Sequence, residues 1–429
     1  RKKFGVACLF SLRFFWLRCQ SFSKIKKAKF SSKLKHIYSL LLVIIKRVYS
    51  RRGYTILSSQ RSNTIEYLRG IGMLGVIGIH TGAYALDNPQ MSVHLFALLE
   101  IVTRFCVPIF FFISAFGLFF RFDPEISFDY GKFLVQRCRS LIIPFWVWTA
   151  YYLCFYGYKY NVNPWLDWEK VWKSFLLGQA SYHMYFMVIL IWFYLLMPLW
   201  RWIVIRVWDW PIKFLTILLI AQIGFNYYSS YMRMPKVDGY FLNLLIEYRQ
   251  SYLVLHYLFI FLFGALWSAR LGYFNQIIFT HTQVVKGFFY LTLVGMLGAY
   301  YFCLGMWSYR PDEAVNTVHQ LNPIGVLYTL AAAMFLYVTL SQGIEESKGK
   351  KILGILGHYS FMIYLIHPTM MYFVERFLII DRWVMDIPVA ILFYSLVVLS
   401  SLLFAWVAEK IVQKAPVLSN LIGVKVKTR

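Results

Sequence analysis

Residues 66–80 read EYLRGIGMLGVIGIH, in which an acidic and a basic side chain near one end and a histidine at the other enclose apolar residues and glycines. The same segment, taken over residues 65–86, is long and apolar enough to cross a bilayer. Hydrocarbon about 30 Å thick takes roughly 20 helical residues to cross. The stretch therefore predicts a membrane-spanning helix that carries ionisable groups.

The composition of the whole chain agrees with this prediction. Of the 429 residues, 59% are hydrophobic and 15% are charged, whereas about a quarter of a soluble domain is charged. That leaves too little polar surface to coat a soluble globule. Aromatic residues make up 20% of the chain, and Trp and Tyr favour the membrane–water interface. The composition therefore excludes a soluble enzyme.

Ten stretches are long and apolar enough to cross a membrane, and they predict an all-α, polytopic helical bundle. They lie near residues 65–86, 95–120, 141–158, 181–203, 212–230, 250–270, 286–306, 323–342, 352–374 and 388–412. Lys and Arg gather in the loops on one side, and such loops face the cytoplasm in membrane proteins. We therefore expect both termini in the cytoplasm, which also agrees with an even number of spans.

Basic residues are concentrated at the N-terminus, where residues 1–65 carry 16 Lys and Arg and no Asp or Glu. No nucleic-acid-binding motif accompanies this charge, so we expect a flank attracted to anionic lipid and no nucleic-acid partner. Residues 37–45 are predicted to form an interfacial helix. The first methionine is Met73, inside the first span, so the tail need not be native and we assign it no catalytic role.

The predicted organisation thus has three parts. They are a basic tail over residues 1–64, a ten-helix membrane domain over residues 65–412 and a short basic tail over residues 413–429.

Arg69 and His80 are eleven residues apart, so in a helix they lie within roughly 20° of one face and about 16 Å apart along the axis. They cannot touch, and they mark the ends of a polar stripe that enters the membrane. Ionisable groups at such depth usually line a cavity. Arginine suits a phosphate-bearing ligand and histidine suits proton transfer. A snorkelling arginine and a histidine bonded between helices would give the same pattern.

The same segment contains Gly70-x-Gly72-x-x-Gly75, formally a dinucleotide-binding fingerprint. That motif requires a preceding strand and a βαβ unit. Inside a membrane helix, small residues instead let neighbouring helices approach closely. We therefore expect these glycines to serve helix packing.

Other ionisable groups have a structural and a functional interpretation. Glu100 and Arg104 are four residues apart, and an ion pair on one helix face is expected. Arg137 and Arg139 would anchor the cytoplasmic edge of the third span or grip phosphate. A lone histidine, such as His183, more often bonds a neighbouring helix than acts as a catalyst. The six cysteines form no CxxC pair and no HxxxH pair occurs, so no bound metal is expected.

Taken in order, these segments resemble the membrane acyltransferase 3 family, ten-helix enzymes that O-acylate cell-surface sugars. Residues 66–80 are similar to the family's opening, an acidic residue followed by Leu-Arg-Gly and a histidine. VPIFFFISAF at residues 107–116 resembles its second-span motif. Three more motifs are similar: Arg137-x-Arg139 with Pro144-Phe145, HMYF at residues 183–186, and GHYSFMIYLIH at residues 357–367. The resemblance covers about residues 62–412.

The resemblance implies a multi-pass enzyme of the cell's inner membrane that takes an acetyl or succinyl group from cytoplasmic acyl-CoA. The implied acceptor is a hydroxyl of a cell-surface or lipid-linked saccharide. Catalysis would fall on His80, as general base or transient acyl carrier, with Arg69 and Glu66. The donor's phosphates would be held by Arg69, Arg137 and Arg139. The acceptor side would be formed by Ser114, Glu100, His183 and His367, or the two histidines would instead orient His80.

Two other classes of protein remain open at this point. A transporter or flippase of lipid-linked saccharide also needs a polar path through a helical bundle, and it would move its substrate regardless of acyl donor. A polysaccharide polymerase would be expected to carry a large, charged outer loop. The longest predicted outer loop, near residues 159–180, has about 22 residues.

Overall fold

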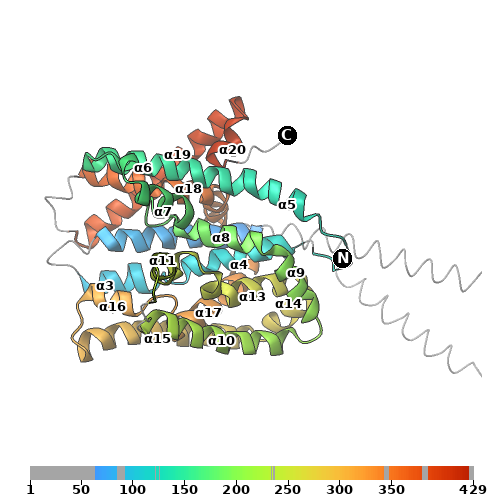
Figure 1. The fold of residues 1–429 in the computed structure, drawn as a ribbon. Coiled ribbons are helices and arrows are strands. Elements are labelled where there is room, and N and C mark those ends of the chain that lie inside the picture. The colour runs from blue at the N-terminus through green and yellow to red at the C-terminus, as the bar shows by residue number, and fades with distance from the viewer. Residues whose placement is uncertain are drawn as a thin grey trace, which may run out of the picture. The chain divides into compact units, whose positions relative to one another are not determined.

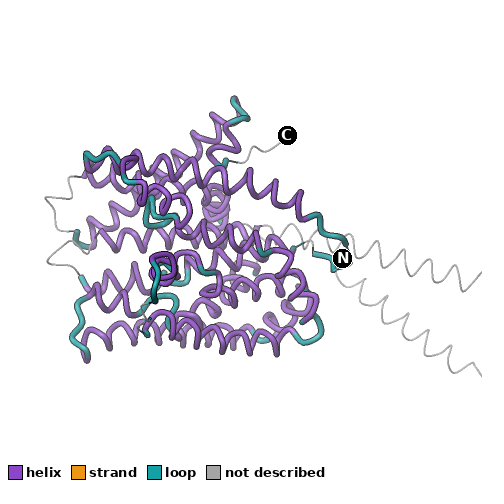
Figure 2. The backbone as a smooth tube through the Cα atoms, in the orientation of Figure 1, coloured by secondary structure: helices purple, strands orange, loops and turns teal. Residues whose placement is uncertain are grey.

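The computed structural model describes residues 63–84, 92–120, 122–124, 126–232, 234, 237–342, 347–378 and 385–424. Every regular element in this part of the chain is a helix, and no strand occurs among these residues (Figure 2). The all-α prediction is therefore confirmed for them. The basic tail and the predicted interfacial helix lie outside the described residues.

Helix occupies each of the ten segments that the sequence marks as candidate spans. The first is the helix over residues 63–84, which carries the opening motif. The others are α3 (Val93–Phe96) with η1 (Ala97–Ile101) and α4 (Cys106–Phe119), η2 (Cys138–Ile142) with α6 (Ile143–Tyr160), α8 (Tyr185–Leu195) with α9 (Met197–Arg206), α10 (Pro211–Tyr231), η4 (Val254–Tyr257) with α13 (Leu258–Ala269), α15 (Thr282–Met306), α17 (Pro323–Ser341), α18 (Lys348–Leu378) and α19 (Ile387–Lys414).

Four helical stretches are by themselves long and apolar enough to cross a membrane, namely Val93–Phe119, α15, α17 and α19. Two bent pairs qualify if each counts as one span: α8 with α9, bent by 61°, and Val254–Ala269 with Leu271–Thr280, bent by 103°. The described part of the chain thus carries four to six candidate spans. The number ten and the cytoplasmic position of both termini stay predictions.

Shorter helices connect the long ones, and one of them replaces an expected loop. α14 (Leu271–Thr280) turns back sharply after α13. Its Phe274 and Ile278 are buried, and a spacing of four residues places them on one helix face. The other connecting helices are α5 (Tyr130–Arg137), η3 (Pro164–Leu166), α7 (Trp168–Leu177), α11 (Tyr240–Glu247), α12 (Arg249–Tyr252) and α16 (Pro311–Thr317), and α20 (Leu418–Ile422) follows the last long helix.

The long helices pack in pairs, with α13 against α4, α18 against α19 and α15 against α17. In the view of Figure 1, α6, α18 and α19 lie above the blue helix over residues 63–84, and α10, α15 and α17 lie below it. Leu68 of that helix and Ile109 of α4 are fully buried. The helix over residues 63–84 is therefore packed against other helices of the bundle.

Glycines of the opening motif bring the helix over residues 63–84 against its neighbours. A Cβ on Gly70 would lie 2.4 Å from the backbone oxygen of Leu353 in α18, and one on Gly75 would lie 2.0 Å from Sγ of Cys106 in α4. Helices approach this closely only where a side chain is absent. The expectation that these glycines pack helices, and do not bind a nucleotide, therefore agrees with the structure.

Adding a single methyl group at Gly70 should destabilise the bundle, because the backbone oxygen it meets belongs to a packed helix. We expect Gly70→Ala to lower the free energy of unfolding by about 1–3 kcal/mol, the usual effect of overpacking. Gly287→Ala is the matched control, since no atom lies within 4 Å of a Cβ at that position of α15. Thermal unfolding in detergent measures both. Equal transition temperatures for the two variants would contradict the close-packing argument.

Candidate functional site

A cavity of about 560 Å³ lies among the helix over residues 63–84, α4, η2, α8, α18 and the C-terminal residues. Seven of the nine residues that the sequence marks as candidates line it. They are Glu66, Arg69, His80, Ser114, Arg137, Arg139 and His183. The polar stripe inferred from the spacing of Arg69 and His80 therefore faces one shared cavity. Side chains from distant parts of the chain meet on it.

One end of the cavity holds Arg69, Arg137 and Arg139, and we call it the arginine end. Arg69 donates to the carboxylate of Glu66 at 2.6 Å. The guanidinium of Arg137 lies 5.1 Å from the ring centre of Phe133 and 5.0 Å from that of Tyr194. Its buried Nε has no hydrogen-bond partner among the described residues. The arginine end thus offers positive charge that the protein does not fully neutralise.

Two prolines follow cavity-lining arginines, at places where the backbone departs from regular α-helix. Pro108 lacks an amide hydrogen, so the carbonyl of Arg104 four residues earlier loses its usual helical donor. The helix is interrupted there, between the π-helical η1 and α4. Pro144 has the same effect on Ser140 within the π-helical η2, beside Arg139. π-Helical turns often mark functional sites; here η1 precedes the cavity-lining Arg104, and η2 itself contains the cavity-lining Arg139.

Three histidines from three different segments meet at the other end, and we call them the histidine cluster. The ring of His80 stacks on that of His367, with centroids 5.3 Å apart and an interplanar angle of 22°. His183 lies 5.1 Å from His367, edge to face. His80 and His183 line the cavity, whereas His367 lies behind them. Residues more than 280 positions apart in sequence are thereby brought into contact.

Hydrogen bonds hold two of these rings and fix the tautomer of one of them, His367. His367 Nδ1 lies 2.8 Å from the carbonyl oxygen of Tyr364, so this nitrogen carries the proton and donates it. His183 Nδ1 lies 3.1 Å from the Ser181 hydroxyl. The Nε2 atoms of both rings are buried and have no partner among the described residues. A buried unpaired nitrogen is costly in an apolar interior. Because His183 lines the cavity and His367 does not, the Nε2 of His183 is the one that an incoming group can reach.

His80 is held by ring contacts alone. Its ring lies 4.4 Å from that of Tyr182 and makes no hydrogen bond to the described part of the chain. Because the ring also lines the cavity, its nitrogens are free to exchange a proton with a ligand there. This geometry suits a general base or a nucleophile.

Glu100 forms the ion pair expected from its spacing, with its carboxylate 3.1 Å from Arg104. It is buried and does not line the cavity, so its predicted part in substrate binding has no support from its position. Arg104 does line the cavity. Its Nη2 donates to the Val315 carbonyl at 3.2 Å, and its buried Nε has no partner among the described residues. The spacing of Arg104 from Glu100 predicts only the ion pair. The sign in the sequence of a further role is its position four residues before Pro108.

Tyrosines complete the wall between the two ends. Ser114, a predicted substrate residue, exchanges a hydrogen bond with Tyr194 at 3.0 Å, and both line the cavity. Tyr364 donates to the backbone carbonyl of His183 at 2.5 Å. Gln320 also reaches the cavity, from the residues before α17. Neither the tyrosines nor Gln320 carried a signal that sequence alone distinguishes from ordinary helix packing.

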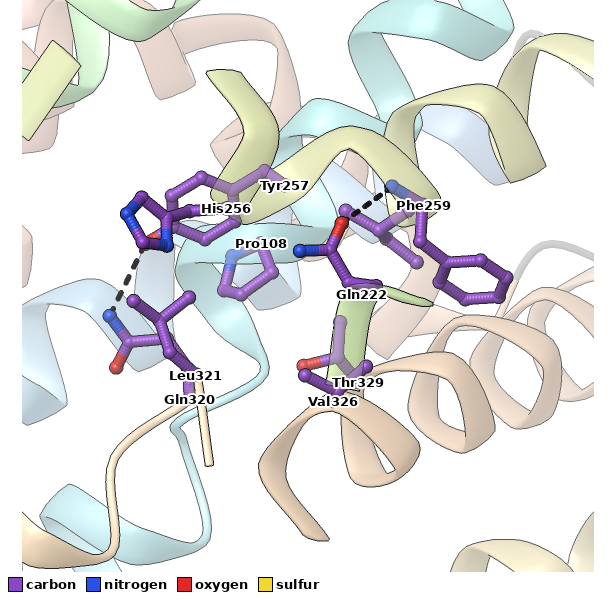
Figure 3. A pocket seen from close by; sticks show the side chains of 10 residues that line it. Pro108, Gln222, His256, Tyr257, Phe259, Gln320, Leu321, Val326 and Thr329 are labelled. Carbon is purple, nitrogen blue, oxygen red and sulfur yellow. Dashed lines mark hydrogen bonds between the residues drawn. The ribbon is translucent and has the colours of Figure 1, made fainter. Parts of the chain in front are cut away.

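A second cavity of about 20 Å³ lies beside Pro108, where Figure 3 shows His256, Tyr257, Gln222 and Gln320 around it. That volume suits a single water molecule. Both ring nitrogens of His256 have partners, the Ser229 hydroxyl at 3.3 Å and the Asn226 side-chain oxygen at 3.2 Å. His256 is therefore a structural histidine, in contrast with His80. In the described ranges, no group of three or more His, Cys, Asp or Glu is arranged to hold a metal ion.

The chain was compared with families of known proteins, with curated proteins and with solved structures. The family model for the acyltransferase domain of the acyltransferase 3 family matches residues 62–409. No curated protein and no solved structure matches the chain. The matched residues include every part of the cavity except its C-terminal wall. Since the match spans most of the 429 residues, the chain belongs to the acyltransferase 3 family.

Proposed function

We propose that this membrane acyltransferase moves an acyl group, acetyl or succinyl, from cytoplasmic acyl-CoA to a hydroxyl of a cell-surface or lipid-linked saccharide. Its location would be the cell's inner membrane. The observation that carries the proposal is one continuous cavity that joins the arginine end to His80. The family assigns acyl transfer, and the cavity suggests where each substrate binds.

The donor suits the polarity of the cavity, which carries arginines in one part and histidines in another. CoA carries phosphates at one end and its thioester at the other, separated by a long, narrow arm. Arg137 and Arg139 would bind the phosphates, with Arg69 beside them, since guanidinium groups bind phosphate oxygens through paired hydrogen bonds. Arg69 and His80 lie about 16 Å apart along their helix, so a donor held at the arginine end would extend its thioester toward the histidine cluster.

His80 would act as the general base. The proton of the saccharide hydroxyl moves to a ring nitrogen of His80 while the hydroxyl oxygen forms a bond to the thioester carbonyl carbon. Collapse of this adduct breaks the carbon–sulfur bond, and the CoA thiolate takes the proton back from the ring. In a two-step variant, the His80 nitrogen accepts the acyl group first and passes it on to the hydroxyl.

The remaining cavity residues would support this chemistry. His367 stacks on His80 and would orient its ring. His183, beside them, would contact the acceptor through its free Nε2. Arg104 supplies a positive charge on the same cavity, and such a charge stabilises the negative oxygen of a tetrahedral adduct. Glu66 would hold Arg69 in position through their ion pair.

Membership of an acyltransferase family favours this function over saccharide transport. A transporter would have no need of an acyl donor. Release of CoA that depends on a saccharide acceptor therefore distinguishes acyl transfer from transport. The assay is purified protein in detergent with radiolabelled acetyl-CoA or succinyl-CoA and candidate glycans. Label on glycan supports the proposal, and absence of donor binding with every glycan supplied would count against it.

His80→Ala should remove acyl transfer while leaving the amount of folded protein unchanged. Loss of a general base reduces the rate by about 10²- to 10⁴-fold. His94→Ala is the matched control, because His94 is exposed and bonds Tyr301 away from the cavity. CoA release and label on glycan are the readouts. Full activity of the His80 variant would falsify the mechanism.

Arg137→Gln and Arg139→Gln should raise KM for acyl-CoA by about tenfold each, because each removes a charge-assisted contact to phosphate. KM for acyl-pantetheine, which has no nucleotide, should not change. Arg206→Gln serves as the control, since Arg206 is exposed and does not line the cavity. An equal loss for both donors would mean that these arginines act on the fold and not on phosphate.

A further inference from the structure

The chain continues past the residues that match the family, which end at 409. After α19 ends at Lys414 it turns and forms α20, followed by Gly423 and Val424. This C-terminal segment, residues 415–424, packs against α6 and η2. It therefore lies beside the part of η2 that carries Arg139.

Specific contacts hold the segment in place. The indole nitrogen of Trp148 donates to the Ile422 carbonyl at 3.5 Å, and the Ser419 hydroxyl donates to the Val424 carbonyl at 2.6 Å. Gly423 has φ +78°, and a Cβ there would lie 2.5 Å from the Phe361 ring. A left-handed turn that close to a neighbour favours glycine. Val424 is buried, so the segment is an ordered part of the domain.

Four residues of the segment line the large cavity, namely Ser419, Asn420, Gly423 and Val424. Of these, Asn420 is exposed, which places it at the rim. Its amide makes no hydrogen bond to the described part of the chain. An exposed amide at the rim of a site lined by arginines is therefore free to bind the part of a ligand that stays near the mouth.

We propose that the C-terminal segment is the adenine-recognising wall of the donor site, with the Asn420 amide bonded to the base of acyl-CoA. This inference rests on the proposed donor. Asparagine forms two hydrogen bonds with adenine, accepting from N6 and donating to N7. With the phosphates on Arg137 and Arg139, the base remains at the cavity mouth, where Asn420 lies.

The test measures binding, so it does not depend on knowing the acceptor. Titration calorimetry of the full-length protein in detergent compares CoA with 1,N6-etheno-CoA, whose bridged N6 cannot donate a hydrogen bond. We expect the wild type to bind etheno-CoA about tenfold more weakly than CoA, within the range for such a pair. We expect Asn420→Ala to bind CoA about tenfold more weakly and not to distinguish the two ligands.

Controls separate the possible failures. Gln413→Ala changes an exposed residue of α19 outside the cavity and should bind both ligands as the wild type does. Asn420 is exposed, so its alanine variant should keep the wild-type melting temperature. If the wild type binds CoA but Asn420→Ala binds it equally well, the adenine assignment is wrong. If the wild type binds no CoA, the proposed donor itself is wrong.

Discussion

The structure depends on the cost of placing charged and polar side chains inside an apolar helical bundle. A buried ionisable group needs a partner, or an aqueous cavity, because the hydrocarbon around it offers neither. Glu100 with Arg104 and Gln222 with Asn226 take the first solution. Arg137 and His80, which are partly buried, take the second solution, and both line the same cavity. Several helices thus place their polar side chains on the same cavity.

That constraint explains why part of the site could be read from the sequence. The eleven-residue spacing of Arg69 and His80 fixes their common helix face, so their shared cavity followed from helix geometry alone. The ion pair of Glu100 followed in the same way from its spacing. The positions of helices followed from runs of apolar residues. In the described part of the chain, only four to six of the ten predicted spans meet the length and apolarity that a span requires. The remaining helices are bent, or are rich in tyrosine, as α6 is, and tyrosine lowers their mean hydropathy.

What could not be read is the contact between helices far apart in sequence. Nothing in the pattern around His367 shows that its ring stacks on His80, because that contact depends on how α18 crosses the first helix. Tyr194 and Gln320 reach the cavity for the same reason, and their spacing carries no sign of it. The sequence does not predict the helix α14, because only two of its residues, Phe274 and Ile278, form the buried face. These contacts, and the helix α14, depend on tertiary packing and not on the local propensity of the sequence.

The two prolines, Pro108 and Pro144, also bear on how this domain tolerates change over evolution. Each lies a fixed number of residues after an arginine that lines the cavity. One inserted or deleted residue between Arg104 and Pro108, or between Arg139 and Pro144, would turn the side chain by about 100° around its helix and point it into lipid or a neighbouring helix. These two short stretches should therefore accept many substitutions yet keep a constant length among descendants of this chain.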